Sequence, residues 1–402
     1  MKVLQINAIY GSKSTGTIVR EIQSCCTKEG IDCFVAFSIA DNSIPVPNGI
    51  RIGNRMTAKW HAFVSRIVGK QAYFNRFTTW LFLRRVGKLK PDVVHLHNLH
   101  SNYIHLNMLL RYLAKHDIPT IITMHDCWYY TGGCTHYTSL CCYRWKTGCG
   151  QCPQWKQIPS WFVDTTKAVL KDRRKYINAI PRVTIVGASS WIASEAGSSV
   201  LKDKSICFIH NGFDLNIFHP RLSIKREELG IKKQFVILGS AEKWTLPINR
   251  PTLDYFVDHM DNNMVMVLFG NRHPSYSESL TKIIWLGYVK DRQEMAEIYS
   301  MADVFVNCSR EDTLSSLNLE CQACGTPVVT YEATGSKETV NGECGFSVET
   351  GDYEALWSMT MKVHDSGKDA FSGLCQNWIK TFFEKEVNYK KYIELYRKVT
   401  SV

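Results

Sequence analysis

The chain has 402 residues, which is enough for two domains with separate hydrophobic cores. Apolar residues make up 45% of the sequence and charged residues 21%, as in ordinary soluble globular proteins. No stretch approaches the roughly 20 successive apolar residues of a membrane-spanning helix. The opening run, Met1–Ile6, is too short for a signal peptide, so we expect a cytoplasmic protein.

The net charge of +11 is concentrated in the first half of the chain. Residues 1–190 contain 25 basic and 9 acidic residues, whereas residues 191–402 contain 23 basic and 28 acidic residues. Residues 51–90 contain ten basic residues and no acidic one, interleaved with Trp60, Phe63, Phe77 and Trp80. Such a mixture favours an anionic bilayer surface; the alternative is a solvated basic face whose aromatic residues belong to the core. No nucleic-acid-binding motif accompanies the charge, so nucleic acid is not an expected partner.

The first half alternates short apolar runs with helical segments. Strands are predicted at 3–8, 92–97, 119–125 and 182–186, with helices after Gly16 and across 107–115. This alternation is typical of βαβ units in a parallel sheet. The loop from Gly11 to Gly16 lacks the Lys-Ser or Lys-Thr pair of a Walker A loop. Its place at the end of the first strand is where α/β folds bind ligands.

His125 closes the strand predicted at 119–125 and is followed by Asp126. A histidine at the end of a strand can hydrogen-bond a sugar or accept a proton. The alternative is a packed histidine bonded to the backbone. His97 and His100 are further candidates near the end of the preceding strand.

A cysteine-rich insertion follows His125 at 127–155. Cys149 and Cys152 form a C-x2-C pair, and Cys134 and Cys142 can complete a set of four sulfurs. Four thiolates suit a closed tetrahedral structural zinc site. An unliganded cysteine-rich loop and redox chemistry are the alternatives. Because the rest of the chain reads as cytoplasmic, structural disulfides are not expected.

The second half repeats the alternation. Strands are predicted at 235–239, 264–269, 283–286, 304–307 and 328–331, with a helix at 292–301 and a last helix at about 384–399. The economical interpretation is two tandem doubly wound, Rossmann-like α/β domains. We place the first domain at 1–210, the second at 211–385 and a terminal crossover helix at 386–402, with the hinge near Asn211-Gly212.

The segment 312–338 carries the strongest functional pattern. Asp312 precedes Glu320 by eight positions, and a helix between them ends at Gly325-Thr326-Pro327. Leu314 belongs to the apolar side of that helix, while Ser315 and Ser316 lie in its first turn, where unpaired backbone N–H groups attract phosphate. A carboxylate one to two turns later can accept hydrogen bonds from sugar hydroxyls. Phosphate and hydroxyls side by side describe a nucleotide-sugar.

This Asp-x7-Glu segment resembles the donor site of retaining glycosyltransferases of family 4, in which the first acid is a glutamate. The segment Asn211-Gly212-Phe213-Asp214-x3-Phe218-x-Pro220 is similar to that family as well. The resemblance implies the GT-B fold, in which two Rossmann-like domains face a cleft and the terminal helix returns to the first domain. The chain also resembles the subset of the family that builds bacterial surface polysaccharides.

The resemblance also implies roles for individual residues. Asp312 contacts the transferred sugar and Glu320 holds the ribose, while His125 contacts the sugar or the acceptor. The loop from Gly11 to Gly16 lies over the phosphates and the acceptor, with His97 on the acceptor side. Arg250 is the first candidate for the basic residue that binds the diphosphate and Lys243 the second. Gly270 and Tyr288 follow strands where the family binds the base. No cofactor is required for catalysis.

We therefore expect a retaining glycosyltransferase at the inner face of the plasma membrane. It moves a hexose-type sugar from a UDP- or GDP-linked donor to a glycan acceptor that is lipid-linked. A nucleotide-sugar epimerase or phosphorylase of the same fold is the first alternative. A non-enzymatic membrane or nucleic-acid adaptor is the second.

Overall fold

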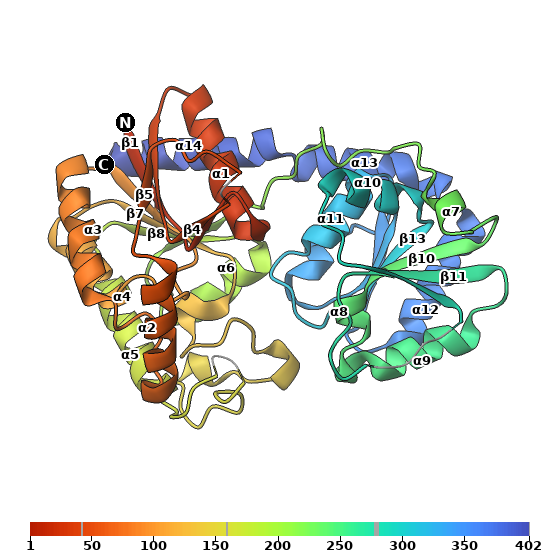
Figure 1. Ribbon diagram of the computed structural model, residues 1–402, viewed down its shortest axis with the longest axis horizontal. Coiled ribbons are helices and arrows are strands. Elements are labelled where there is room, and N and C mark those ends of the chain that lie inside the picture. Colours follow the sequence, from red (N-terminus) through yellow and green to blue (C-terminus); the bar gives the residue numbers. More distant parts are fainter. Residues whose placement is uncertain (42, 158–159, 277–280, 402) are drawn as a thin grey trace. The chain divides into compact units, whose positions relative to one another are not determined.

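The computed structural model of the chain describes residues 1–41, 43–157, 160–276 and 281–401. It divides into two compact units, which we call unit 1 (Met1–Asn211 with Glu386–Val402) and unit 2 (Gly212–Lys385). Each unit has a parallel sheet with helices on both faces (Figure 1). The two Rossmann-like domains predicted from the sequence are thereby confirmed.

Unit 1 is built on a seven-stranded parallel sheet with the strand order β5-β3-β1-β6-β7-β8-β9. Its strands are β1 (Lys2–Ile6), β3 (Asp32–Phe37), β5 (Gly49–Arg51), β6 (Val93–Leu96), β7 (Thr120–Met124), β8 (Val183–Gly187) and β9 (Ser205–Phe208). Its helices are α1 (Lys13–Lys28), α2 (Arg55–Val68), α3 (Arg76–Leu89), α4 (Leu106–Lys115), α5 (Thr166–Asn178), α6 (Ser190–Gly197) and most of α14 (Lys385–Thr400). A small separate sheet pairs β2 (Ile9–Tyr10) with β4 (Ile39–Ala40).

The central strands of unit 1 are buried on both faces. Every residue of β6 and β7 is buried, which explains why they read as continuous apolar runs rather than alternating ones. Between β7 and α5, the described residues 127–157 and 160–165 contain only short 3₁₀ helices, η1 (Cys127–Tyr130), η2 (Thr138–Leu140) and η3 (Arg144–Lys146). The predicted cysteine-rich insertion lies within it.

The start of α1 corrects one expectation. The loop predicted from Gly11 to Gly16 ends early, because Ser12 takes an extended N-cap conformation and the helix begins at Lys13. Gly11 has a positive φ of 75°, and its N–H donates to the carbonyl of Gly16 at 3.0 Å. A Cβ on Gly16 would lie 3.2 Å from the carbonyl oxygen of Ile9, so the close turn requires a glycine there.

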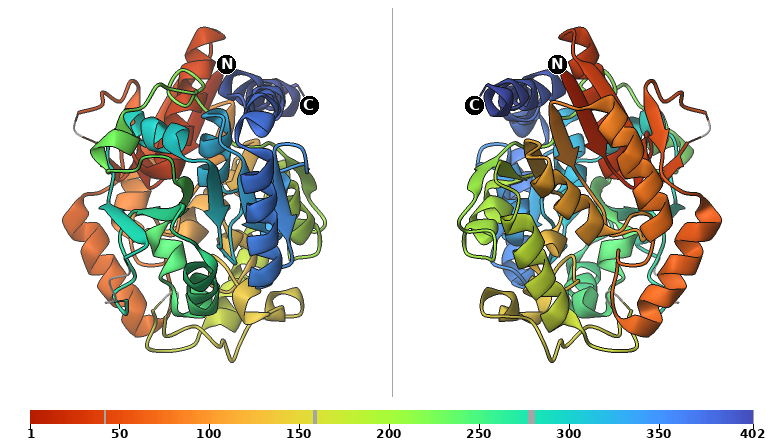
Figure 2. Two further views of the ribbon diagram at one scale, coloured as in Figure 1. Left: turned by 90° about the vertical axis from the view of Figure 1, so that its right-hand side faces the viewer. Right: turned by 90° about the vertical axis from the view of Figure 1, so that its left-hand side faces the viewer.

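Helix α14 completes the core of unit 1. Tyr389, Tyr392, Ile393 and Tyr396 are buried in a cluster with residues of β1, α1 and β6. Tyr396 shares a hydrogen bond of 2.6 Å with Nδ1 of His95 in β6. Both chain ends therefore lie together in unit 1 (Figure 2). The terminal helix returns to the first domain, as the resemblance implies.

Unit 2 has a six-stranded parallel sheet with the order β12-β11-β10-β13-β14-β15. Its strands are β10 (Phe235–Ser240), β11 (Met264–Phe269), β12 (Ile283–Gly287), β13 (Val304–Asn307), β14 (Val328–Tyr331) and β15 (Gly345–Val348). The helical segments are α7 (Lys225–Glu228), α8 (Ala241–Trp244), η4 (Pro247–Asn249), α9 (Arg250–His259), α10 (Arg292–Met301), α11 (Ser316–Ala323), η5 (Thr334–Thr339), α12 (Tyr353–Ser366) and α13 (Asp369–Phe382).

The strand order of unit 2 reverses between β10 and β13. The chain runs outward from β10 through β11 to β12, then returns to the other side of β10 at β13. Ligands of open α/β sheets bind outside the carboxyl ends of the strands at such a reversal. Within the described residues, no helix is both long and apolar enough to cross a bilayer.

Candidate active site

The loops after β10 and β13 meet at the reversal point of unit 2. Helix α8 after β10 carries Lys243, and the chain after β13 carries Cys308, Arg310 and Asp312. The buried side chain of Asn249 ties the two loops together, since its Nδ2 donates to the carbonyls of Lys243 and Cys308, each at 3.0 Å. Side chains from both loops are therefore held at one edge of the sheet.

Two cations converge at this edge. Nε of Arg310 donates to Oδ1 of Asn249 at 3.0 Å, which fixes the guanidinium. The same Asn249 side chain binds the backbone carbonyl of Lys243, so one amide holds both basic residues at this edge. Two positive charges at the end of a parallel sheet suit a diphosphate.

Helix α11 begins beside these cations, and its cap corrects the prediction for Ser315. The Ser315 hydroxyl is fully buried, accepts from the backbone N–H of Asn318 at 3.5 Å and accepts from Nδ2 of Asn307 at 3.1 Å. It is therefore the N-cap, and its hydroxyl is engaged inside unit 2 rather than exposed in the first turn. Ser316 is the first helical residue and is half-buried, whereas Leu314 packs into the core of unit 2.

Asp312 and Glu320 flank the start of α11, as the spacing predicts. The backbone of Asp312 is pinned, because its N–H donates to the Thr334 hydroxyl at 2.9 Å and its carbonyl accepts from Gly335 at 3.0 Å. Glu320 is half-buried, and its Oε2 accepts from the Tyr299 hydroxyl at 3.1 Å. Burial raises the Glu320 pKa to about 7, while the charge of Arg292 and the Tyr299 hydroxyl oppose the rise. Additional hydroxyl donors would stabilise its ionised form.

The remaining predicted donor residues differ in their surroundings. Arg250 is bound to Asp254 one helical turn away at 2.7 Å and lies over the ring of Tyr276. Its charge is already balanced, so the geometry favours Lys243 over Arg250 as the diphosphate ligand. Gly270 follows β11 with a φ of 92° and open space where a Cβ would lie. Tyr288 follows β12 and is 73% exposed, which leaves its ring accessible for stacking.

Arg310 is the residue that the sequence analysis missed. Its position directly before Glu311-Asp312, after a buried strand, is the only signal in the sequence. Its orientation depends on Asn249, which lies 61 positions away along the chain.

In unit 1 a line of hydrogen bonds joins Gln5, His97 and His125 across β1, β6 and the end of β7. Nε2 of His97 lies 3.1 Å from Oε1 of Gln5, and Nδ1 of His97 lies 3.0 Å from Nε2 of His125. His97 is fully buried, so it stands behind His125 and positions it rather than contacting an acceptor. His100 pairs with Asp126 at 3.2 Å.

This line of bonds fixes which nitrogen of His125 carries a proton. Nε2 of Gln5 donates to the carbonyl of Val19, so Oε1 of Gln5 accepts and Nε2 of His97 must donate to it. Nδ1 of a neutral His97 then accepts from Nε2–H of His125. Burial lowers the pKa of His125 to about 4, which keeps the ring neutral. The remaining Nδ1 of His125 is buried, and its lone pair has no hydrogen-bond partner among the described residues.

The four cysteines predicted to bind zinc lie together. Cys134, Cys142, Cys149 and Cys152 line one cavity of about 20 Å³, whereas the adjacent Cys141 is exposed and does not line it. In the described residues, no three His, Cys, Asp or Glu side chains already stand as a metal-ligand set. A metal would therefore require the thiols to turn toward the cavity.

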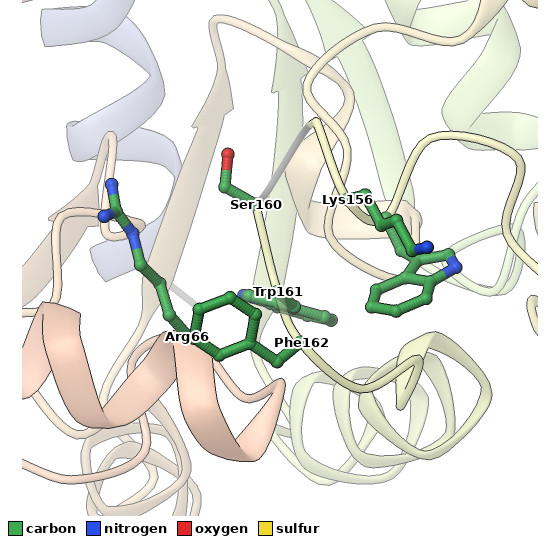
Figure 3. Close-up of a pocket in the computed structure, with 6 residues that line it drawn as sticks. Arg66, Lys156, Ser160, Trp161 and Phe162 are labelled. Atoms are coloured by element: carbon green, nitrogen blue, oxygen red, sulfur yellow. The ribbon is translucent and has the colours of Figure 1, made fainter.

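A larger pocket of about 390 Å³ opens between the end of α2 and residues 155–156 and 160–162. Figure 3 shows the Arg66 side chain beside the ring of Phe162, with Trp161 beyond it and Lys156 on the other side. Its lining, Arg66, Trp155, Lys156, Ser160, Trp161 and Phe162, combines two cations with three aromatic rings.

Known proteins share the fold over its whole length. Sucrose-phosphate synthase from Thermosynechococcus elongatus superposes with a TM-score of 0.70 at 16% identity, covering 100% of this chain and 99% of that one. HepE of Anabaena, solved in complex with UDP, gives 0.65 at 15% identity, covering 99% and 100%.

The sequence relatives are glycosyltransferases. An Escherichia coli K12 protein described as the colanic acid biosynthesis glycosyl transferase WcaC is 20% identical over 363 residues, 87% of each chain. CapM of Staphylococcus aureus, a capsular polysaccharide biosynthesis glycosyltransferase, is 36% identical over 69 residues, 17% of this chain and 18% of CapM. Residues 232–365 match the sequence profile of Glycosyl transferases group 1, and residues 16–217, half of the chain, match that of Glycosyltransferase Family 4. The chain therefore belongs to glycosyltransferase family 4.

Proposed function

We propose that this glycosyltransferase moves a hexose from a UDP- or GDP-linked donor to a lipid-linked glycan during surface polysaccharide synthesis, with retention at the anomeric carbon. The polymer class rests on the likeness to WcaC and CapM. A uridine donor agrees with HepE, which was solved with UDP and with UDP-glucose.

The observation that carries the proposal is the pair of cations at the reversal point of unit 2. Lys243 and Arg310, both held by Asn249, stabilise the negative charge that develops on the departing diphosphate. The first N–H groups of α11 add the positive end of a helix dipole. Glu320 accepts hydrogen bonds from the two ribose hydroxyls, which offset the cost of ionising a half-buried carboxyl. Asp312 accepts hydrogen bonds from hydroxyls of the transferred sugar. In unit 1, Nδ1 of His125 accepts a hydrogen bond from a hydroxyl of the acceptor.

In the retaining reaction that we propose, the acceptor hydroxyl attacks from the face that the diphosphate leaves. The bond between the anomeric carbon and the diphosphate oxygen breaks, and a bond to the acceptor oxygen forms on the same side. The acceptor proton passes to the departing phosphate oxygen. No residue needs to form a covalent sugar adduct in this scheme.

Calorimetric titration with UDP and GDP tests the donor site. Lys243→Ala and Arg310→Ala should each weaken nucleotide binding by about tenfold or more, because each removes one charge-assisted contact of about 1.5–3 kcal/mol. Arg250→Ala removes the same charge from a residue already paired with Asp254 and serves as the matched control. Equal losses in all three variants, or none with any nucleotide, would contradict the assignment.

The proposal that the acceptor is lipid-linked rests on the exposed surfaces of α2 and α3. Met56, Trp60, Phe63 and Ile67 recur along α2 at helical spacing and are all exposed, with Met56 at 81% and Trp60 at 62%. On α3, Phe77 and Trp80 are exposed and stack with their ring centres 6.0 Å apart. The segment that holds both helices has ten cations and no acid. An anionic bilayer surface complements this composition.

The pocket at the end of α2 then suits the head of the lipid-linked acceptor. Arg66 and Lys156 are placed for its phosphates, and the rings of Trp155, Trp161 and Phe162 for its apolar or sugar portions. The enzyme would thus work as a peripheral protein at the inner face of the plasma membrane.

A further inference from the structure

The cysteine-rich segment between β7 and α5 lacks regular structure but is well packed. Its described residues, 127–157 and 160–165, form only short 3₁₀ helices, yet they include the buried rings of Tyr130, Tyr137, Trp145 and Trp161. A connection of this length without helices or strands is uncommon in a compact domain and needs a constraint of its own. All 15 cysteines of the chain are free thiols, so no disulfide supplies it.

We propose that Cys134, Cys142, Cys149 and Cys152 bind one structural zinc ion. The cavity that they line measures about 20 Å³, enough for a single water-sized sphere and thus for one metal ion. Glycines 132, 133 and 150 line it too, together with Arg144, Trp145, Gln154 and Thr166, and a Cβ on Gly132 would meet Cβ of Cys149 at 2.9 Å. The absent side chains leave room for the sulfurs to close on a central ion.

The turn inside the C-x2-C pair is held by a neighbouring side chain. Nη1 of Arg144 donates to the carbonyls of Gly150 and Gln151, the two residues between Cys149 and Cys152. Both cysteines are thereby fixed next to the cavity.

A buried cation, Arg173, lies beside the cysteine cluster and also points to a metal centre. The Arg173 side chain is 1% exposed, and its Nη1 donates to the carbonyls of Trp128 and Thr131. Its Nε and Nη2 have no hydrogen-bond partner, and it forms no ion pair within the described part of the chain. Thr131, whose carbonyl Arg173 binds, donates from its own hydroxyl to the carbonyl of Cys134, so the guanidinium lies close to the cysteine cluster. It also lies over the ring of Trp128, 3.9 Å from the ring centre.

The charges of a zinc–thiolate centre and of Arg173 have opposite signs, which favours a bound metal ion. Four thiols that bind Zn²⁺ release four protons and leave a centre of charge −2, and N–H donors that have no other partner can bond its sulfurs. Arg173 supplies a positive charge and two such donors close to Cys134.

Metal analysis of the full-length protein purified without chelator tests the inference. Wild type and Cys141→Ser should each contain one zinc per chain, because Cys141 neighbours Cys142 but does not line the cavity. Cys149→Ser and Cys152→Ser should lose most of it. If a variant fails to fold, zinc chloride titrated into chelator-treated wild type gives a second measurement: it should restore a lowered melting temperature and protect four thiols from alkylation.

Two results would overturn the proposal. One is that wild-type protein contains less than one zinc per chain and is not stabilised by added zinc chloride, or that it contains iron instead of zinc. The other is equal metal loss in Cys141→Ser and Cys149→Ser, which would indicate adventitious binding. Nucleotide binding by unit 2 should persist in the chelated protein, so failure here is separable from failure of the donor site.

Discussion

At the scale of single residues, the donor site combines groups that the sequence reveals with others that only packing reveals. Asp312 and Glu320 follow from their spacing around one helix. Arg310 does not, because its position is set by Asn249 from a different loop. The buried state of Ser315 is equally invisible in the sequence, since it depends on Asn307 reaching the cap from β13.

Glu320 should make the stability of unit 2 depend on pH. Its pKa is about 7 in the folded chain against an ordinary value of 4.5. Between these values the folded chain binds more protons than the unfolded one, so stability falls as pH rises through this window. Glu320→Gln should therefore stabilise the protein at pH 8 and lose most of that advantage at pH 5, while it weakens UDP binding. Denaturant midpoints at both pH values measure this, and a difference that does not vary with pH would refute it.

The tautomer of His125 should depend on Gln5, a residue that touches no ligand. Gln5→Met removes the acceptor of the His97 Nε2 proton, so His97 can turn its proton toward His125. Nδ1 of His125 then carries the proton and no longer accepts from a hydroxyl of the acceptor. We expect the transfer rate to fall on the order of 10²-fold with little change in UDP affinity.

The ¹⁵N shifts of the imidazole nitrogens distinguish this effect from simple loss of packing. Nδ1 of His125 should move from the unprotonated to the protonated range in Gln5→Met and stay unprotonated in Gln5→Glu, which keeps an acceptor. If the ¹⁵N shifts of His125 are unchanged in Gln5→Met although the transfer rate falls, the loss of activity comes from altered packing instead.

At the scale of elements, central strands are the easiest to predict. The sequence places β11, β13, β14 and α10 at their observed bounds, because fully buried strands are continuous apolar runs between turn residues. It leaves out β5, β9 and β15, which lie at the edges of their sheets. β9 is largely exposed and has no burial pattern to detect. β3 was also left out, although its buried run Cys33–Phe37 is a clear signal.

Helices α2 and α3 should decide membrane binding. Arg84 lies over the ring of Trp80, so cation and apolar surface form one patch. Reversing Arg84 and Arg85 to Glu should shift the protein from vesicles of anionic lipid to the supernatant, since each basic residue near such a surface contributes about 1 kcal/mol. Reversing Lys232 and Lys233, two exposed neighbours in unit 2, is the matched control. Sedimentation with anionic and zwitterionic vesicles measures the shift. If both variants bind the vesicles equally well, α3 is not part of the membrane-binding surface.

At the scale of the whole molecule, α14 makes the stability of unit 1 depend on the end of the chain. Tyr396 is fully buried among residues of β1, α1 and β6, and its hydroxyl is bound to His95. Tyr396→Ala should cost about 3–5 kcal/mol through the cavity it leaves, as large aromatic truncations do. The loss should fall on unit 1, because the core of unit 2 is a separate cluster.

Calorimetry with and without UDP can separate the two units. UDP should raise only the transition of unit 2, by an amount set by its concentration relative to the dissociation constant. Tyr396→Ala should lower only the other transition, and Tyr396→Phe, which keeps the ring and loses one hydrogen bond, should lower it by about 1 kcal/mol. If UDP instead rescued the transition that Tyr396→Ala lowers, the units would unfold as one cooperative body, because a ligand stabilises only the cooperative unit to which it binds.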